Sequence, residues 1–173
     1  MSLSTRAIAA IGAVVVIGAG TVGGSIAYAN SQGEPPENVV TLTVGRTSIT
    51  SEPFCYNDGK ALQQDVLAKC QVDAKKAREA NKLPSSDVLA SDRIGVGVPP
   101  SVADRGWFAF TDGGTQGQAP LAQDTRGSTW SGSVLASTVL NASGTTTVTV
   151  VEADQKSQEI LGIWYFELKT PQD

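Results

Sequence analysis

Apolar residues in this chain form one long run near the N-terminus, followed by short runs in which apolar and polar residues alternate. The short runs are rich in β-branched and aromatic residues, and Gly, Pro, Asn and Asp clusters separate them, which is typical of antiparallel strands joined by turns. Strands are predicted at residues 39–44, 47–50, 93–98, 107–111, 129–134, 145–152 and 160–169. The pattern predicts a mainly β fold, an immunoglobulin-like antiparallel β-sandwich that spans residues 39–173.

A short helical insertion interrupts the predicted strands. Residues 60–69 have the composition of a short helix, and residues 72–82 (VDAKKAREANK) are rich in strong helix formers. The second segment is polar on most of its faces, so we expect it to extend into solvent.

The long apolar run, residues 7–29, contains no charged residue. As a helix it would span roughly 35 Å at about 1.5 Å per residue, enough to cross a hydrocarbon core of about 30 Å. Arg6 is the only basic side chain before it, so the positive-inside bias places residues 1–6 in the cytoplasm and the later residues outside. We expect a single-pass transmembrane anchor in the cell membrane, followed by a Pro-containing linker at residues 30–38.

Small residues recur at helical spacing within this predicted anchor, at Ala9, Ala13, Gly20 and Gly24. The last two match the pattern of small residues four apart that lets helices approach closely in a membrane. We therefore expect this face to pack, within the lipid bilayer, against helices of integral membrane subunits.

The N-terminal run also has features of a signal peptide and of a dinucleotide-binding motif. The tripeptide AYA, which ends at Ala29, is a possible cleavage site, so the run could instead be a signal peptide, although it is longer than a usual signal core. Gly18, Gly20 and Gly23 match the glycine fingerprint of dinucleotide-binding folds. Such a fold needs a long helix after the glycines and strands that alternate with helices, and the sequence has neither, so no nucleotide cofactor is expected.

The composition narrows the classes of function. The 173 residues carry 13 basic and 17 acidic side chains, a net charge of −4, and no basic patch stands out, so nucleic acid is not expected as a partner. The chain has no histidine, which removes the usual general base, the commonest metal ligand and every triad built on histidine. We accordingly expect a protein that is not an enzyme and that holds neither a cofactor nor a metal.

The two cysteines, Cys55 and Cys70, bracket the first predicted helical segment. In an oxidising compartment such a pair is expected to form a disulfide, which in the chain-entropy model stabilises a loop of about 15 residues by roughly 3 kcal/mol. Two free, buried thiols are the alternative. A zinc site is disfavoured because two sulfur ligands without histidine fall short of four.

Aspartates that could in principle form a carboxylate pair for glycoside cleavage, or bind Ca²⁺, are Asp58, Asp65, Asp104, Asp112 and Asp124. Their spacing forces no two of them together, and Asp58 and Asp112 each precede a glycine in a turn-like sequence. Among the tryptophans, Trp107 and Trp164 are expected in the core. Trp130 lies in the polar context STWSGS and is the candidate for an exposed contact.

Three segments, CYNDGKALQQDVLAKC, RIGVGVPPSVADRGWFAF and GIWYFELK, resemble a family of actinobacterial secreted or lipoprotein-like cell-envelope proteins with a domain of unknown function. The resemblance covers most of the chain after Val39. The sequence departs from many members because it lacks a lipid-attachment cysteine and inserts a charged stretch around residues 72–92. The residues that fall on the family pattern are Cys55, Tyr56, Asp58, Gly59, Lys60, Cys70, Pro99, Ala103, Asp104, Gly106 and Trp107.

The resemblance implies a place in the cell envelope of a Gram-positive actinobacterium and implies no particular activity. Together with the predicted anchor, it leads us to expect a non-catalytic accessory subunit of a larger membrane complex, with an outer-face β domain for protein–protein contact. The family context suggests the respiratory cytochrome supercomplex as a host. The alternative is a secreted or anchored cell-envelope module that binds a ligand in an aromatic-lined pocket, and a hydrolase is the remaining possibility.

Overall fold

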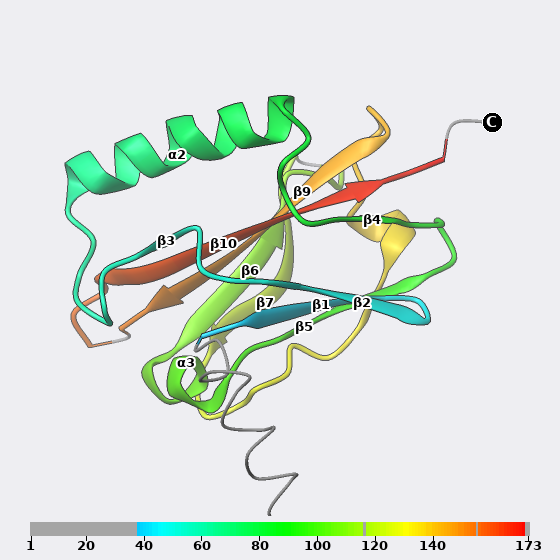
Figure 1. Ribbon diagram of the computed structural model, residues 1–173. Helices are drawn as coiled ribbons and strands as arrows, with labels where there is room; N and C mark the ends of the chain where they lie inside the picture. The colour runs from blue at the N-terminus through cyan, green and yellow to red at the C-terminus, as the bar shows by residue number, and fades with distance from the viewer. Residues whose placement is uncertain (1–37, 116, 155, 172–173) are drawn as a thin grey trace, which may run out of the picture. The chain divides into compact units, whose positions relative to one another are not determined.

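The computed structural model describes residues 38–115, 117–154 and 156–171. This part of the chain is mainly β and forms a four-stranded and a six-stranded sheet, with few helices (Figure 1). The arrangement is that of a β-sandwich, so the predicted fold class is confirmed at this level. The predicted anchor, residues 7–29, lies outside the described residues, and within those residues no helix is long and apolar enough to cross a membrane.

The four-stranded sheet, here sheet A, has its strands in the order β2-β1-β5-β8. These strands are β2 (Thr47–Ser51), β1 (Val40–Val44), β5 (Arg93–Gly97) and β8 (Val134–Leu135). All of its pairings are antiparallel. Apolar residues of β1 alternate with threonines, so one face of the strand is fully buried and the other is partly open.

The six-stranded sheet, here sheet B, has the order β3-β10-β9-β6-β7, and β4 pairs in parallel with β10. Its strands are β3 (Cys55–Tyr56), β10 (Ile160–Lys169), β9 (Thr145–Ala153), β6 (Trp107–Thr111), β7 (Ala119–Thr125) and β4 (Ser85–Asp87). The long hairpin of β9 and β10 forms its centre.

The main core contains the buried faces of both sheets, and its largest fully buried side chains include Trp107, Trp164 and Phe166. Each indole has its polar atom satisfied, since Trp107 Nε1 donates to the Ser128 carbonyl at 2.8 Å and Trp164 Nε1 donates to the Asn38 carbonyl at 2.9 Å. The prediction that both tryptophans are core residues is confirmed.

The helical insertion is one helix, α2 (Gln64–Glu79), where the sequence predicts two segments. No proline or glycine separates the two predicted segments, so the helix continues through both of them. Residues 60–63 stay outside it because Leu62 donates its backbone N–H to the Ile160 carbonyl at 2.7 Å. A second helix, α3 (Pro100–Arg105), begins with a proline at its first position, and η1 (Ala136–Thr138) is a single 3₁₀ turn.

Apart from shifts of one residue at strand ends, the strands differ from the predictions at four places. The predicted strand at 129–134 is only a bridge at Trp130 followed by β8, because the Ser/Gly-rich segment between them does not pair continuously. The strands β3 and β4 are two and three residues long, too short for an alternation to be visible in the sequence. The sequence also gives no clear signal for β7, which carries Pro120 and pairs irregularly with β6.

Candidate functional site

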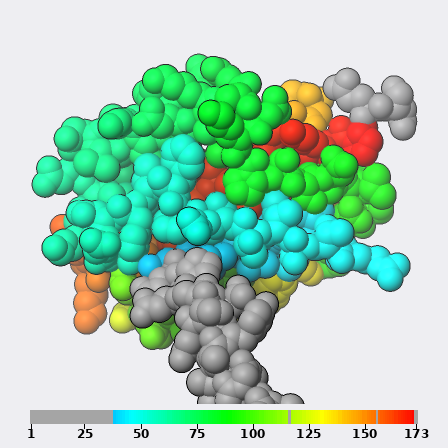
Figure 2. Space-filling view, in the orientation of Figure 1, coloured from blue at the N-terminus to red at the C-terminus, as the bar shows by residue number. Residues whose placement is uncertain are grey.

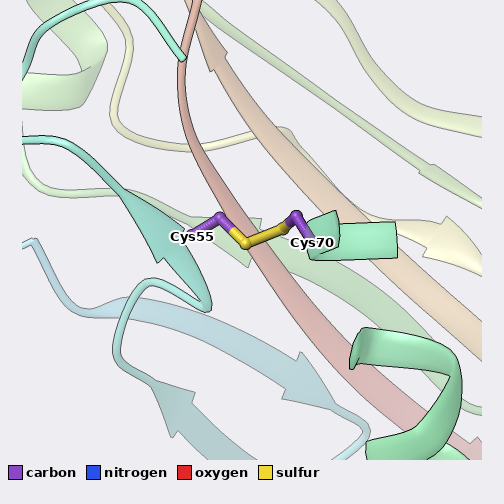
Figure 3. Close-up of a disulfide and its surroundings, with 2 residues drawn as sticks. All are labelled: Cys55 and Cys70. Atoms are coloured by element: carbon purple, nitrogen blue, oxygen red, sulfur yellow. A yellow bond between two sulfur atoms is a disulfide. The ribbon is translucent and has the colours of Figure 1, made fainter. Parts of the chain in front are cut away.

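A disulfide joins Cys55 and Cys70, as predicted, and it attaches α2 to the strand β3 at the edge of sheet B (Figure 3). The two Cα atoms are 6.2 Å apart, and Cys70 is buried. A small apolar cluster surrounds the bridge, in which Leu62, Cys70 and Ile163 are buried. The disulfide and this cluster therefore hold the helix against the outer face of β10.

The helix lies along one side of sheet B, over β3 and β10 (Figure 1). In the space-filling view α2 covers part of β10, whose red atoms show beneath the helix and beyond its end (Figure 2). The fully buried side chains of the helix are small, Cys70 and Ala74, and Leu67 packs partly buried against the cluster around the disulfide. Small contact residues leave room between helix and sheet, and a groove follows this line.

The first compartment of the groove has a volume of about 310 Å³. Its lining combines one face of α2, outward-facing side chains of β9 and β10, Leu83 after the helix and Asp112 after β6. The lining residues are Gln71, Ala74, Lys75, Arg78, Leu83, Asp112, Thr147, Thr149 and Tyr165. The second compartment, about 600 Å³, lies at the end of the helix and is lined by Arg78, Glu79, Asn81, Asp112, Asn141, Ser143, Thr145 and Glu167. Since both share Arg78 and Asp112, we treat them as one feature, the α2 groove.

An ion pair spans the α2 groove where the two compartments meet. Arg78 Nη1 stands 3.3 Å from Asp112 Oδ2 and donates to Thr147 Oγ1 at 3.1 Å. Asp112 also accepts the Thr147 backbone N–H through Oδ1 at 2.7 Å, which fixes the carboxylate. Both ion-pair partners are partly exposed, so the pair contributes little to stability, and it joins α2 to the segment after β6 across the groove.

Glu167 lies in the second compartment with only 5% of its side chain exposed. Its Oε2 atom is buried and has no hydrogen-bond partner among the residues that the structure describes. Its Oε1 atom is 3.7 Å from Lys169 Nζ, which itself donates to Asn81 Oδ1 at 3.2 Å. A buried acceptor without a partner is costly, so Glu167 retains one unused position for a hydrogen-bond donor.

Tyr165 contributes a phenol to the first compartment, and burial raises its pKa above the ordinary value of 10.0. The phenol is therefore neutral at physiological pH and can both donate and accept a hydrogen bond. Phe54 packs edge-on against it, with ring centroids 5.5 Å apart, and this contact restricts the ring.

The aspartates named from the sequence come from different elements. Asp112 lines the α2 groove, whereas Asp65 lies in the first turn of α2, Asp104 in α3 and Asp124 in β7. Asp58 has a positive φ, as does Gly59, and the Lys60 N–H bonds the Asn57 carbonyl, which is the geometry of a type I′ turn. Among residues 38–115, 117–154 and 156–171, no three acidic, histidine or cysteine side chains gather so as to hold a metal ion.

An ion pair between the partly exposed Arg105 and the buried Glu152 was not predicted. Arg105 Nη1 is 2.9 Å from Glu152 Oε1, while the buried Glu152 Oε2 has no hydrogen-bond partner in the described part of the chain. Burial raises the pKa of Glu152, and the Arg105 guanidinium opposes this shift. The sequence carries a signal for it, because Glu152 occupies an inward position in the alternation of β9, after Val148 and Val150.

The same pair explains why two of the segments used for the family resemblance meet. A Cβ atom at Gly59 would stand 2.6 Å from Arg105 Nη1, so the Asp58-Gly59 turn can lie against the guanidinium only because residue 59 is glycine. The CYNDGK segment thus packs on the residue just before Gly106 and Trp107. These residues have a structural role that the sequence alone does not reveal.

Trp130 is exposed, with 43% of its surface accessible, as the sequence suggests. Its ring also covers Gly95 on the outer face of sheet A, since any Cβ at that position would overlap the indole. Part of the tryptophan therefore shields a glycine backbone, and its role as a contact for a partner stays a prediction.

A pair of aromatic side chains on the outer face of β6 was not singled out from the sequence. Phe108 and Phe110 are half-buried and stacked, with centroids 6.1 Å apart and an interplanar angle of 14°. The signal was the alternation itself, because Trp107, Ala109 and Thr111 are buried and the intervening phenylalanines must then face outward. A hollow of about 690 Å³ adjoins Phe108 and is lined by Asp124, Ala153, Asp154, Gln158 and Ile160.

The predicted helix-packing residues Ala9, Ala13, Gly20 and Gly24 lie outside the described residues. Comparison of the chain with models of known protein families, with curated proteins and with solved structures gives no match. The fold and the site therefore define a class only: a β-sandwich-like domain with a disulfide-attached helix and a polar groove beneath it.

Proposed function

We propose that this chain is a non-catalytic, membrane-anchored accessory subunit of a larger membrane protein complex. In this proposal residues 7–29 form the single-pass anchor, and the β domain, with an immunoglobulin-like arrangement, makes protein contacts at the outer face of the membrane. The partners are integral membrane subunits, and the respiratory cytochrome supercomplex is the host that we would examine first.

The observation that carries the proposal is the stacked pair Phe108 and Phe110. Aromatic side chains dominate the binding energy of protein interfaces, because they bury large areas at little cost in conformational entropy. The pair is continuous with apolar surface at Ala153 and Ile160, and carboxylates at Asp124 and Asp154 border it. Backbone N–H groups of Ser157 and Lys156 lower the pKa of Asp154, which keeps this border charged. An apolar centre with a polar rim is the usual anatomy of an interface.

The test is affinity purification of the tagged full chain from membranes in mild detergent, followed by a native gel. The wild type is expected to migrate with a large complex. The double variant Phe108→Ser/Phe110→Ser is expected to lose most of this association, so that little of it migrates with the complex. The matched control is Val66→Ser/Val72→Ser, which removes two exposed apolar side chains from α2. The proposal fails if the wild type runs alone, or if both double variants retain the complex equally.

The second candidate function is a cell-envelope module that binds a ligand, and the α2 groove favours it. Two compartments with convergent polar groups lie within the size range of ligand sites. To test it, the full chain in detergent is incubated with purified cell-wall material and sedimented. Thr145→Trp, which fills the second compartment, is expected to reduce sedimentation, and Thr50→Trp on exposed β2 is the control. Equal sedimentation of the two variants would exclude the groove as the binding site.

A further inference from the structure

We infer that the second compartment of the α2 groove binds an ammonium or guanidinium group of its ligand, with Glu167 as the principal acceptor. This inference rests on the second candidate function and names the chemistry of the ligand. It begins from Glu167, which lines a compartment of otherwise polar side chains and whose buried Oε2 atom has no hydrogen-bond partner among the described residues.

The charges around the compartment favour a cation. Glu79, Asp112 and Glu167 face it, against the guanidinium of Arg78 and the nearby ammonium of Lys169. Arg78 is already paired with Asp112, so it offers little compensation to the other two carboxyl groups. Lys169 hydrogen-bonds Asn81 and stands 3.7 Å from Glu167, too far for a hydrogen bond.

The end of α2 adds to this preference. The helix ends at Glu79, and the C-terminus of a 16-residue helix carries a partial negative charge from its aligned peptide dipoles. The oxygen atoms of Ser143 and Thr145 complete the lining opposite the helix. A ligand ammonium would compete with Lys169 for Glu167 and gain a charge-assisted hydrogen bond, the stronger kind of hydrogen bond in proteins.

The volume admits more than a bare ion. At about 600 Å³ the compartment has room for a side chain or a single sugar ring that carries the cationic group. A basic peptide side chain and an amino sugar share this chemistry, so the experiment must distinguish them.

The experiment is a titration of the ¹⁵N-labelled full chain in detergent micelles, followed through the backbone amides of Thr145, Thr147 and Glu167. The probes are Nα-acetyl-lysine methylamide and glucosamine, each compared with its neutral N-acetylated counterpart. We expect at least one cationic probe to shift these amides and both neutral forms to leave them unchanged. Which of the two cations binds more tightly identifies the source.

Glu167→Gln keeps the size of the side chain and is expected to weaken the binding at least tenfold. Glu159 is exposed in the β9–β10 connection, so Glu159→Gln removes the same charge far from the groove lining. This control variant is expected to leave the binding of the cationic probe unchanged. Shifts of equal size in both variants would show attraction by net charge alone and overturn the inference. It is also overturned if no cationic probe shifts the three amides, or if the neutral probes do so equally well. The cell-wall experiment tests ligand binding at the groove independently of the ligand's charge.

Discussion

Glu152 shows at the scale of a single residue how burial and charge compete. The side chain occupies a position where β9 otherwise places Thr, Val and Val, and it is 1% exposed. One oxygen is paired with Arg105, and the other has no hydrogen-bond partner among the described residues. Desolvation is the largest influence on its pKa and raises it, and the coulombic attraction of Arg105 only partly offsets this rise.

This shift predicts a dependence of stability on pH. A carboxyl group whose pKa is raised by folding binds its proton more tightly in the folded state. Its stabilising contribution is therefore fully present when the pH is below the pKa of the group in the unfolded chain. That contribution is lost as pH rises from about the ordinary value of 4.5 through the folded value. The free energy of unfolding of the wild type, relative to that of Glu152→Gln, should therefore decrease as pH rises from 4 to 8. Urea unfolding at several pH values measures this difference.

The exposed Glu159 provides the control, because Glu159→Gln removes a carboxyl group that faces solvent. The difference in free energy of unfolding between Glu159→Gln and the wild type should change less with pH than the difference between Glu152→Gln and the wild type. A stability difference at Glu152 that stays constant or grows with pH would contradict the assigned direction of the pKa shift.

At the scale of elements, the helix α2 depends on its attachment. Its buried face consists of Cys70 and Ala74, two small side chains that supply little apolar area. The disulfide to β3, the apolar cluster that Leu67 joins, and the partly exposed pair of Arg78 with Asp112 link it to sheet B. Because surface ion pairs are weak and the cluster is small, we expect the covalent link to contribute strongly to this attachment.

Removing the disulfide should therefore loosen the helix as well as reduce stability. For Cys55→Ala/Cys70→Ala we expect a loss of about 3 kcal/mol in the free energy of unfolding, as the chain-entropy model gives for a loop of this length. Amide exchange should accelerate along α2 more than in β9. The wild type treated with reductant should behave like the variant. A loss below about 1 kcal/mol with unchanged exchange in α2 would show that packing alone holds the helix.

The elements differ in how far the sequence determines them. The strands β1, β6, β9 and β10 were predictable because their alternation or apolar content reflects burial that persists over at least five residues. The strands β3 and β4 owe their existence to pairing with β10, which no local pattern records. The disulfide was predictable from the cysteine count, whereas the α2 groove depends on the path of a helix over a sheet.

The same difference separates the candidate sites. The alternation of β6 and β9 could have revealed Phe108, Phe110 and Glu152. The two phenylalanines are apolar on an outward face, and the glutamate is charged on an inward face. Glu167 and Asp112 could not, because residues 55 positions apart in sequence meet only through the order of strands in sheet B. Sequence periodicity indicates which face a residue occupies, but not what lies across from it.

At the scale of the whole molecule, the described domain is organised around its tryptophans. Trp164 lies in the main core and its indole N–H bonds the carbonyl of Asn38, two residues before β1 begins. Trp107 makes the equivalent bond to Ser128, beyond the end of β7. Each tryptophan thus ties a connecting segment to the core.

Replacing Trp164 with Phe keeps an aromatic ring and removes the donor. We expect a loss of about 1–3 kcal/mol in the free energy of unfolding, because the variant loses a hydrogen bond and some packing. Amide exchange should also accelerate at the start of β1. Trp107→Phe is the matched control: it removes an indole of the same burial and should leave exchange at the start of β1 much less affected. Equal acceleration in both variants would mean that the bond to Asn38 fixes nothing locally.

The position of Asn38 has a mechanical consequence. Traction applied to the chain on the N-terminal side of Asn38 would act first on a backbone carbonyl held by a core indole, and next on β1, which has hydrogen-bonded neighbours on both sides. Extracting an interior strand lengthwise requires many bonds to shear together, whereas an outer strand can peel away one bond at a time. Pulling on the N-terminal side of this domain is therefore expected to meet more resistance than pulling on an outer strand would.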